Sequence, residues 1–289
     1  MTPEAKPFAA RCWCAQPGRR AFTGLLLTAA AAPAMAAIPE CRRSKTGRLI
    51  PADQVEGAAQ QQYAQLVAEA RNQGALAPQD NAQLQRLRYI ASRIIPQAAG
   101  CNDRSNQWRW EVQLLNSQQV NAFCMPGGKI AFYSGILSRL KLDDNEVAVI
   151  MGHEVAHALL EHARERIAKS TGTSLGLRLG AALLGLGSLG DMAAQGLANL
   201  ASLKFGRDDE SEADALGLLL AARAGYDPRS GVTLWQKMSA HSGGRAPPEW
   251  LSTHPAGEAR IKEIQERLPR ALPEFEAAAK PPRRFAPPN

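Results

Sequence analysis

Two histidines four residues apart, in the run Gly152-His153-Glu154-Val155-Ala156-His157, constrain this chain more than any other feature. The stretch Asp143–Ala168 around them predicts one helix, because Asp143 and Glu146 form a capping-box pattern ahead of apolar residues at helical spacing. Side chains four positions apart project from one face of a helix, so both imidazoles can bind one zinc ion. Glu154 is placed to take a proton from a water molecule at that metal rather than to bind it. A chance match on an ordinary core helix is the alternative.

A second motif is acidic and begins a later helix, at Glu210-Ser211-Glu212-Ala213-Asp214. A zinc ion held by two histidines of one helix needs a third protein ligand and an open position for water. Glu210 and Asp214 share a helix face, so Glu210 can supply that ligand, while Asp214 can accept a hydrogen bond from the far nitrogen of a ligand histidine. Glu212 faces elsewhere and is the weaker candidate. The alternative is a pair of acids on a solvated helix face.

A third motif, Ser252-Thr253-His254-Pro255, precedes a helix expected from about Gly257 to Arg267. Proline restricts the backbone of the residue before it, so the imidazole of His254 is held in one direction. This histidine can donate to a developing oxyanion, or it can cap the zinc reversibly as a fourth ligand in a resting state. A structural histidine at a helix entry is the alternative. We expect His162 and His241 at the surface, without a role.

The remaining pattern predicts a mainly α-helical fold with a small antiparallel β-sheet, an α+β class. A tight turn at Gly127-Gly128 joins two of the strands. An edge strand of such a sheet can pair with an extended peptide and hold it across the metal; the alternative is that the sheet only packs against the metal helix. The expected helices are Gln54–Asn72 and Asn81–Ile95, and the expected strands are Trp108–Leu115, Val120–Cys124 and Lys129–Tyr133.

The apolar, glycine-rich stretch Thr171–Leu203 is interrupted by Arg178 and Asp191, which argues against a membrane span. We expect a mobile helical hairpin or lid over the cleft. A plain buried helix pair and a peripheral contact with a membrane surface stay open. Residues 276–289 are rich in proline and are expected to form a disordered tail.

Residues 1–36 have the layout of an export signal. Arg19-Arg20 precede an apolar run over 21–32, and Ala34-Met35-Ala36 offers a small-residue cleavage site. The arginine pair resembles a twin-arginine signal, and both export routes stay open, as does an uncleaved N-terminal anchor. Glu40 stands where lipoprotein processing needs a small residue, so Cys41 is not expected to carry a lipid. We therefore expect one domain over residues 37–275, located in the periplasm.

Charge and cysteines fit this expectation. The net charge is +7, but no basic run is interleaved with aromatic residues, so no nucleic-acid partner is expected. Cys12 and Cys14 would leave with the export segment. A disulfide between Cys41 and Cys101 is possible in an oxidising compartment, and Cys124 in an apolar strand predicts a buried thiol.

Four motifs follow one another along the chain: Asn121-Ala122-Phe123-Cys124-Met125-Pro126-Gly127-Gly128, Gly152-His153-Glu154-Val155-Ala156-His157-Ala158, Glu210-Ser211-Glu212-Ala213-Asp214 and Thr253-His254-Pro255. In this order they resemble the HtpX/BepA-like zinc endopeptidases, relatives of the CAAX prenyl protease, and the likeness runs from about Gln54 to Pro269. The resemblance implies a minimal, mainly helical gluzincin fold and one zinc ion held by His153, His157 and Glu210. It implies Glu154 as general base and suggests that His254 and Arg260 shape the active site. With Asp214, which can orient a ligand histidine, Glu154 and His254 are the candidate catalytic residues. Asn121, Gly128 and Arg260 are the candidate substrate-binding residues.

The expected function is that of a zinc-dependent endopeptidase of the bacterial cell envelope. Its protein or peptide substrates would be misfolded or misassembled proteins, outer-membrane proteins among them, because periplasmic members of the resembled family act in envelope quality control. The main alternative is a zinc-bearing periplasmic chaperone or assembly factor with a normally closed active site. A protein that binds membrane surfaces is a second alternative.

Overall fold

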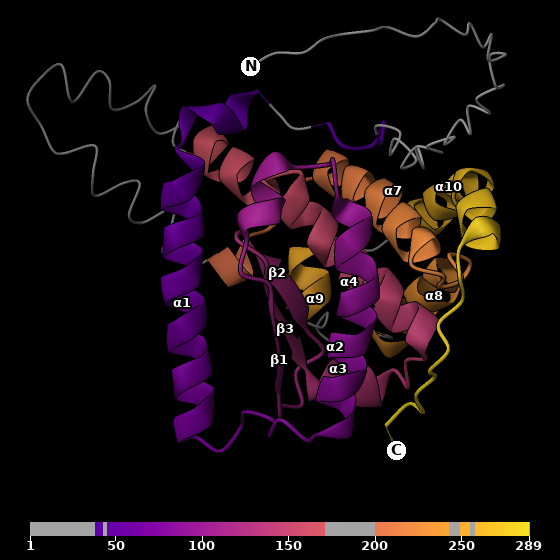
Figure 1. Ribbon diagram of the computed structural model, residues 1–289, viewed down its shortest axis with the longest axis horizontal. Coiled ribbons are helices and arrows are strands. Elements are labelled where there is room, and N and C mark those ends of the chain that lie inside the picture. Colours follow the sequence, from indigo (N-terminus) through magenta and orange to yellow (C-terminus); the bar gives the residue numbers. More distant parts are fainter. Residues whose placement is uncertain (1–37, 43–44, 171–199, 243–248, 255–257, 289) are drawn as a thin grey trace, which may run out of the picture. The chain divides into compact units, whose positions relative to one another are not determined.

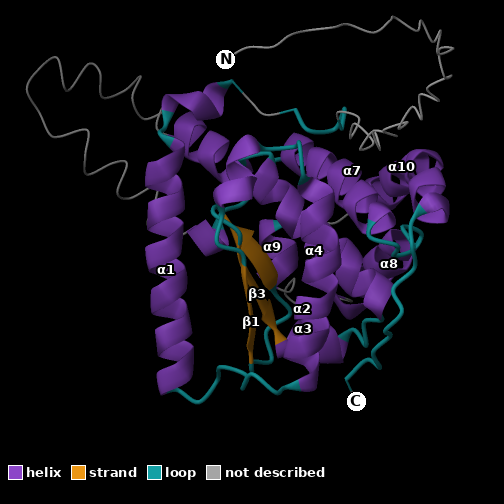
Figure 2. Ribbon diagram, viewed as in Figure 1, coloured by secondary structure: helices purple, strands orange, loops and turns teal. Residues whose placement is uncertain are grey.

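The computed structural model describes residues 38–42, 45–170, 200–242, 249–254 and 258–288. The expected export signal, residues 1–36, and residues 171–199 of the expected lid lie outside these ranges. The described chain is mainly helical with one small sheet (Figures 1 and 2), which confirms the α+β class. Within the described ranges, no helix is both long enough and apolar enough to cross a membrane.

Two of the helices expected from the sequence begin and end close to their predicted positions. Asn81 caps the second of them, because its side chain accepts from the backbone N–H groups of Gln83 and Leu84. The labelled helices are α1 (Ala52–Asn72), α2 (Ala82–Ile94), α3 (Ser134–Arg139), α4 (Asp144–Leu159), α7 (Arg207–Arg223), α8 (Ser230–Ser242), α9 (Glu249–Thr253) and α10 (Glu258–Ala277), with 3-10 turns η1 (Thr46–Leu49), η2 (Ile95–Ala98), η3 (Asp103–Gln107) and η4 (Leu200–Ser202). Residues 162–170 are also helical.

The sheet contains β1 (Glu111–Leu115), β2 (Ala122–Met125) and β3 (Lys129–Tyr133) in the order β1-β3-β2. The expectation of an antiparallel sheet is wrong for one pair: β2 and β3 form an antiparallel hairpin, but β1 runs parallel to β3. The connection between β1 and β2 therefore crosses the end of β3. Gly135 leaves room for it, since a Cβ there would lie 2.4 Å from the carbonyl oxygens of Gln118 and Gln119.

The sheet lies between α1 and the helical core (Figure 1). Side chains alternate across it, so that Phe123, Met125 and Ala131 pack with α1. Tyr63 of α1 fixes this packing, because its hydroxyl donates to the carbonyl oxygen of Ile130 at 2.7 Å. The opposite face, with Cys124 and Ile130, packs with the large core that contains α4.

Helix α4 is the centre of the core and is apolar and buried on nearly all sides. The expected capping box is present: the Asp143 side chain accepts from the Glu146 N–H, and the Glu146 side chain accepts from the Asp143 N–H, both at 2.9 Å. Helix α7 packs directly against α4, because Gly152 and Gly217 meet. A Cβ on Gly152 would lie 2.5 Å from the carbonyl oxygen of Gly217. This close approach brings the acidic motif of α7 to the histidines of α4.

Four further points of the sequence analysis are corrected or confirmed. The helix predicted over Asp143–Ala168 is broken, since α4 ends at Leu159 and a new helical segment covers residues 162–170. The chain end expected to be disordered is described to Pro288 and contacts the core, where the N–H of Phe285 donates to Asp144 at 2.9 Å. The Cys41–Cys101 disulfide, which was only a possibility from the sequence, is formed, and Cys124 is a buried free thiol, as expected.

Candidate metal centre and active site

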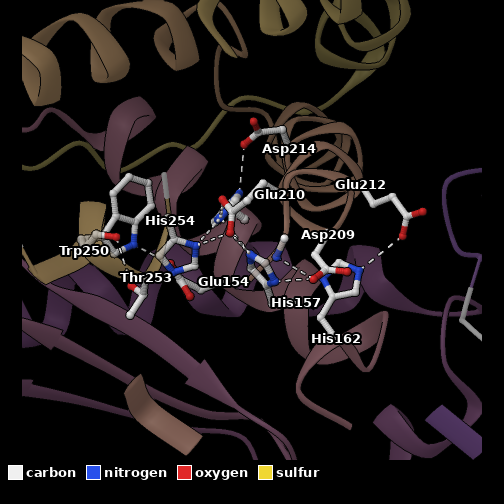
Figure 3. A network of polar contacts seen from close by, with 12 residues as sticks. Glu154, His157, His162, Asp209, Glu210, Glu212, Asp214, Trp250, Thr253 and His254 are labelled. Atoms are coloured by element: carbon white, nitrogen blue, oxygen red, sulfur yellow. Dashed lines mark hydrogen bonds and ion pairs between the residues drawn. The ribbon is translucent and has the colours of Figure 1, made fainter. Parts of the chain in front are cut away.

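Four side chains from three parts of the fold converge in one buried cluster: His153 and His157 of α4, Glu210 of α7, and His254 directly after α9. One possible ligand atom from each lies within 4.8 Å of all the others. The Nε2 atoms of His153 and His157 are 3.0 Å apart, and the Nδ1 of His254 lies 3.3 Å from the former. Figure 3 shows His157, Glu210 and His254 turned toward one another. The structure thus brings together the three predicted ligands and His254, which the sequence analysis offered as a resting-state fourth ligand.

The chemistry of this donor set fits zinc. Ligand bonds of about 2.0–2.1 Å in a tetrahedral site put neighbouring donor atoms about 3.3 Å apart. The separations of 2.9 Å between His254 Nδ1 and Glu210 Oε1 and of 3.6 Å between His153 Nε2 and Glu210 Oε2 lie close to this value, and all four donor atoms lie within 4.8 Å of one another. Three imidazoles and a carboxylate that are buried face to face bring lone pairs together, and a cation satisfies them.

A carboxylate and an arginine support the cluster on the His153 side. Asp214 Oδ1 lies 3.0 Å from His153 Nδ1, as the sequence predicts. Arg260 binds both oxygens of Asp214, at 2.7 and 2.9 Å, and places its Nη1 2.5 Å from Glu210 Oε2. Burial raises the pKa of Asp214, but the charge of Arg260 outweighs it and the pKa is held well below the usual range.

Arg260 therefore lies behind the metal cluster, although the sequence suggested it as a substrate-binding residue. Its guanidinium is buried over the ring of Trp235, with the carbon of the guanidinium 4.0 Å from the ring centre. It does not line the cavity beside the cluster. Its contacts hold the carboxylates of α7 in place.

The His157 side has a different support, and here the expectation was wrong. His162 was expected at the surface, but it is only 1% exposed, and its Nδ1 lies 2.9 Å from His157 Nδ1. Its Nε2 lies 3.4 Å from Glu212 Oε2 (Figure 3). Burial lowers the pKa of His157 well below its ordinary value, and the neighbouring histidines lower it further, which favours the neutral ring that binds metal.

The expected general base, Glu154, is buried and held by a residue that sequence reasoning missed. Trp250 of α9 donates its indole N–H to Glu154 Oε1 at 2.7 Å. His254 Nε2 lies 3.5 Å from the same oxygen. Burial raises the pKa of Glu154 to about 7, although the neighbouring His153 and the Trp250 hydrogen bond act in the opposite direction. The only sequence hint was that Trp250 stands one helical turn before His254, whose N–H donates to the Trp250 carbonyl at 2.8 Å.

A cavity of about 20 Å³ lies beside the cluster, which is room for roughly one water molecule. Residues of β2, including Phe123 and Cys124, form one wall, and Phe205 forms another. The ring of Phe205 stacks on His157 with 4.0 Å between ring centres. The two remaining candidates for substrate binding do not line this cavity. Asn121 accepts from the N–H of Ala122 at the start of β2, and Gly128 lies in the β2–β3 turn.

Comparison with known proteins places the chain in a family. Residues 78–268, which contain all four motifs, match Peptidase family M48. The chain is 43% identical to mitochondrial metalloendopeptidase OMA1 of Arabidopsis thaliana over 153 residues, which cover 53% of this chain and 30% of that protein.

Two bacterial proteins are also similar. Metalloprotease LoiP of Escherichia coli (strain K12) is 29% identical over 208 residues, which cover 71% of this chain and 78% of that protein. The Beta-barrel assembly-enhancing protease of Yersinia pestis is 28% identical over 188 residues, covering 60% of this chain and 37% of that protein. The chain spans between 30% and 48% of the length of OMA1 relatives from plant, yeast and cattle. These matches confirm the resemblance carried by the four motifs, and the chain belongs to peptidase family M48, a family of zinc metalloproteases.

Proposed function

We propose that this protein is a zinc-dependent endopeptidase. The observation that carries the proposal is the buried Glu154 carboxylate next to four converging metal donors. A base beside a metal site is the arrangement that hydrolyses peptide bonds without a covalent intermediate.

His153, His157 and Glu210 would hold the zinc. When bound, zinc supplies a Lewis acid that polarises the peptide carbonyl and brings the pKa of the attacking water toward about 7. Glu154 accepts the proton of that water and passes it to the leaving amine. Trp250 fixes the carboxylate for both steps through the 2.7 Å hydrogen bond to its Oε1.

The substrate would bind as an extended peptide along β2. Among the strands that the structure describes, β2 pairs with β3 alone, and Ala122, Phe123 and Cys124 line the cavity beside the metal donors. Backbone pairing would hold the peptide irrespective of its side chains, which suits an enzyme that acts on unfolded segments. Because the cavity is small, Phe205 and His254 have to move before a peptide enters.

His254 supports a second candidate function. A catalytic zinc keeps one ligand position open for water or substrate, whereas His254 Nδ1 stands among the donors at 2.9 Å from Glu210 Oε1. This position favours a resting-state cap over a donor to the oxyanion. A zinc-bearing chaperone with a normally closed site would have the same arrangement.

We further propose an envelope location and a role in protein quality control. The Cys41–Cys101 disulfide is typical of oxidising compartments. Two bacterial proteases, LoiP and the Beta-barrel assembly-enhancing protease, are among the relatives, which supports this proposal. The name of the second suggests β-barrel proteins as the substrates of the present chain. Residues 1–36, with their export-signal pattern, support the same location.

The test is Glu154→Gln, which keeps the shape of the side chain and the acceptor for Trp250. We expect unchanged zinc content and a loss of peptide hydrolysis of about 10²–10⁴-fold, the usual contribution of a general base. Glu266→Gln on α10, where the carboxylate is 65% exposed, is the matched control and should retain full activity. Near-normal turnover by Glu154→Gln would contradict the proposed mechanism.

The same variant separates the two candidate functions. An unfolded β-barrel protein is incubated with each form, and both its cleavage and its aggregation are followed. If the protein is an endopeptidase, the Glu154→Gln variant should bind the substrate without cutting it and should fail to replace the wild type in cells. If the variant prevents aggregation and replaces the wild type fully, the chaperone is the correct assignment.

A further inference from the structure

The two histidines of α4 each have a partner at the nitrogen that faces away from the metal donors. His153 Nδ1 faces the carboxylate of Asp214 at 3.0 Å. His157 Nδ1 faces a third histidine, His162, at 2.9 Å. Figure 3 shows His162 between His157 and Glu212, on the side of His157 opposite to His254. The two predicted zinc ligands are thus oriented by different chemical groups.

The protonation of this pair follows from the metal site. A neutral histidine that offers the lone pair of Nε2 to a metal carries its proton on Nδ1. The N–H at His157 Nδ1 is buried and needs an acceptor, and the Nδ1 of His162 is placed to accept it. His162 then carries its own proton on Nε2, which faces Glu212 Oε2 at 3.4 Å. Each N–H in the series therefore has an acceptor.

The backbone is shaped to place His162 there. In an uninterrupted helix, a residue five positions after His157 would point to another face. Instead α4 ends at Leu159, Glu161 adopts a left-handed conformation with φ 62°, and the next helical segment begins at 162. A non-glycine residue in this region is strained and persists only where its surroundings hold it.

The surroundings of this kink hold it firmly. Asn102 donates to the carbonyl oxygen of Leu159 at 2.9 Å and to Glu161 Oε1 at 3.4 Å. Arg164 donates to Glu161 Oε2 at 2.7 Å. These contacts fix the turn that brings His162 back beneath His157.

We propose that His162 is a positioning residue, which accepts a hydrogen bond from His157 and thereby sets the tautomer and the ring angle of that zinc ligand. Glu212 fixes His162 in turn. The inference rests on the proposed zinc centre and adds to it a residue outside the four motifs. Mutation of a residue that hydrogen-bonds to a metal ligand typically lowers metal affinity by about 10–100-fold.

The test compares three substitutions of His162 in the full chain. His162→Asn places an oxygen near the position of Nδ1 and keeps an acceptor. His162→Leu has a similar size without any acceptor, and His162→Gln carries its acceptor one bond too far out. His241→Leu, at the end of α8, is the matched control, since no role is assigned to that histidine.

Zinc affinity is measured by competition with a chromophoric chelator, and the ligand geometry by the visible absorption of the cobalt-substituted protein. We expect about 10–100-fold weaker zinc binding and a changed cobalt spectrum for His162→Leu and His162→Gln. The His162→Asn variant and the His241→Leu control should stay close to the wild type. Thermal melts identify any variant that fails to fold. If His162→Leu does not fold, the zinc affinities and cobalt spectra of His162→Asn and His162→Gln are compared instead.

Three results are possible besides the expected one, and each has a definite meaning. Wild-type zinc affinity and cobalt spectrum for both His162→Leu and His162→Gln would overturn the positioning role of His162 and leave the zinc centre intact. Equally weakened zinc binding in His162→Asn, His162→Gln and His162→Leu would show that only the packing of the ring matters, and would also overturn that role. A wild-type chain that binds no zinc would overturn this inference together with the proposed function.

Discussion

At the scale of single residues, the base of the proposed reaction is kept in a costly environment. Glu154 is buried, and burial raises its pKa from 4.5 to about 7. Trp250 donates to one of its oxygens and partly offsets this cost. A carboxylate that is easily protonated near neutral pH is suited to accept a proton and release it again. The same property makes Glu154 a burden on stability.

This burden can be measured in zinc-free protein. Between pH 4.5 and about 7 the unfolded chain releases a proton that the folded chain keeps, so the contribution of Glu154 to stability falls as the pH rises. Glu154→Gln cannot ionise. We expect urea unfolding to show the variant more stable than the wild type by ~3 kcal/mol at pH 8 and by less than ~1 kcal/mol at pH 5. Parallel pH profiles for the two proteins would contradict this account.

Trp250 gives a second prediction at this scale. Trp250→Phe keeps an aromatic ring against His254 but removes the N–H donor to Glu154. Since that hydrogen bond lowers the pKa of Glu154, its loss should move the acid limb of the kcat profile to higher pH. We expect kcat to fall about tenfold, the equivalent of one hydrogen bond to a charged group, with unchanged zinc content. An unshifted pH profile would argue that Trp250 only fills space.

At the scale of elements, α4 combines a well-specified beginning with an unexpected end. Its capping box satisfies two N–H groups at the N-terminus. Asp144 in its first turn also binds the buried Arg86 at 2.6 Å, and the chain end through Phe285. This helix start is therefore the point where α2, α4 and the C-terminal segment join.

Asp143→Ala tests the cap alone. The variant leaves the N–H of Glu146, in the first turn of α4, without its 2.9 Å acceptor, while the two histidines lie in the second half of that helix. We expect a loss of about 1 kcal/mol of unfolding free energy, measured by urea titration, and no change in zinc affinity. A large loss of zinc affinity would mean that the cap positions the histidines, which we do not expect.

The elements also show what could be predicted from the sequence. The cap of α4, the turn at Gly127-Gly128 and the spacing of His153 and His157 are local patterns, and each was predicted correctly. The kink at Glu161 could not be, because Asn102 and Arg164 stabilise it from elsewhere in the fold. The parallel β1–β3 pair was missed for the same reason. The order and direction of strands in a sheet depend on how the whole chain packs, and the sequences of the strands do not determine them. Trp250 and His162 carry no motif, so only tertiary contacts identify them.

At the scale of the whole molecule, the described chain has one large core around α4 and a smaller one between α1 and the sheet. The Cys41–Cys101 disulfide closes a loop with 60 residues of separation, which contains α1 and α2. It links the segment ahead of α1 to the turn ahead of η3. The disulfide therefore restrains the part of the chain that covers the sheet.

Replacing both Cys41 and Cys101 by serine should lower the unfolding free energy by about 2–4 kcal/mol, because the unfolded chain regains the conformational freedom of the loop that the disulfide closes. Chemical denaturation of the variant, and of the wild type with and without reductant, measures the loss. Zinc affinity should not change, since neither cysteine is among the metal donors. Equal stability of the oxidised and reduced forms would contradict a structural role for the disulfide.

We propose that one metal ion held by His153, His157 and Glu210 makes this fold a peptidase. The most direct measurement is elemental analysis of the natively purified protein alongside its hydrolysis of an unstructured peptide, before and after chelation. We predict about one equivalent of zinc per chain, loss of hydrolysis when it is removed, and recovery when zinc is returned. Full hydrolysis by protein that contains no metal would contradict the account.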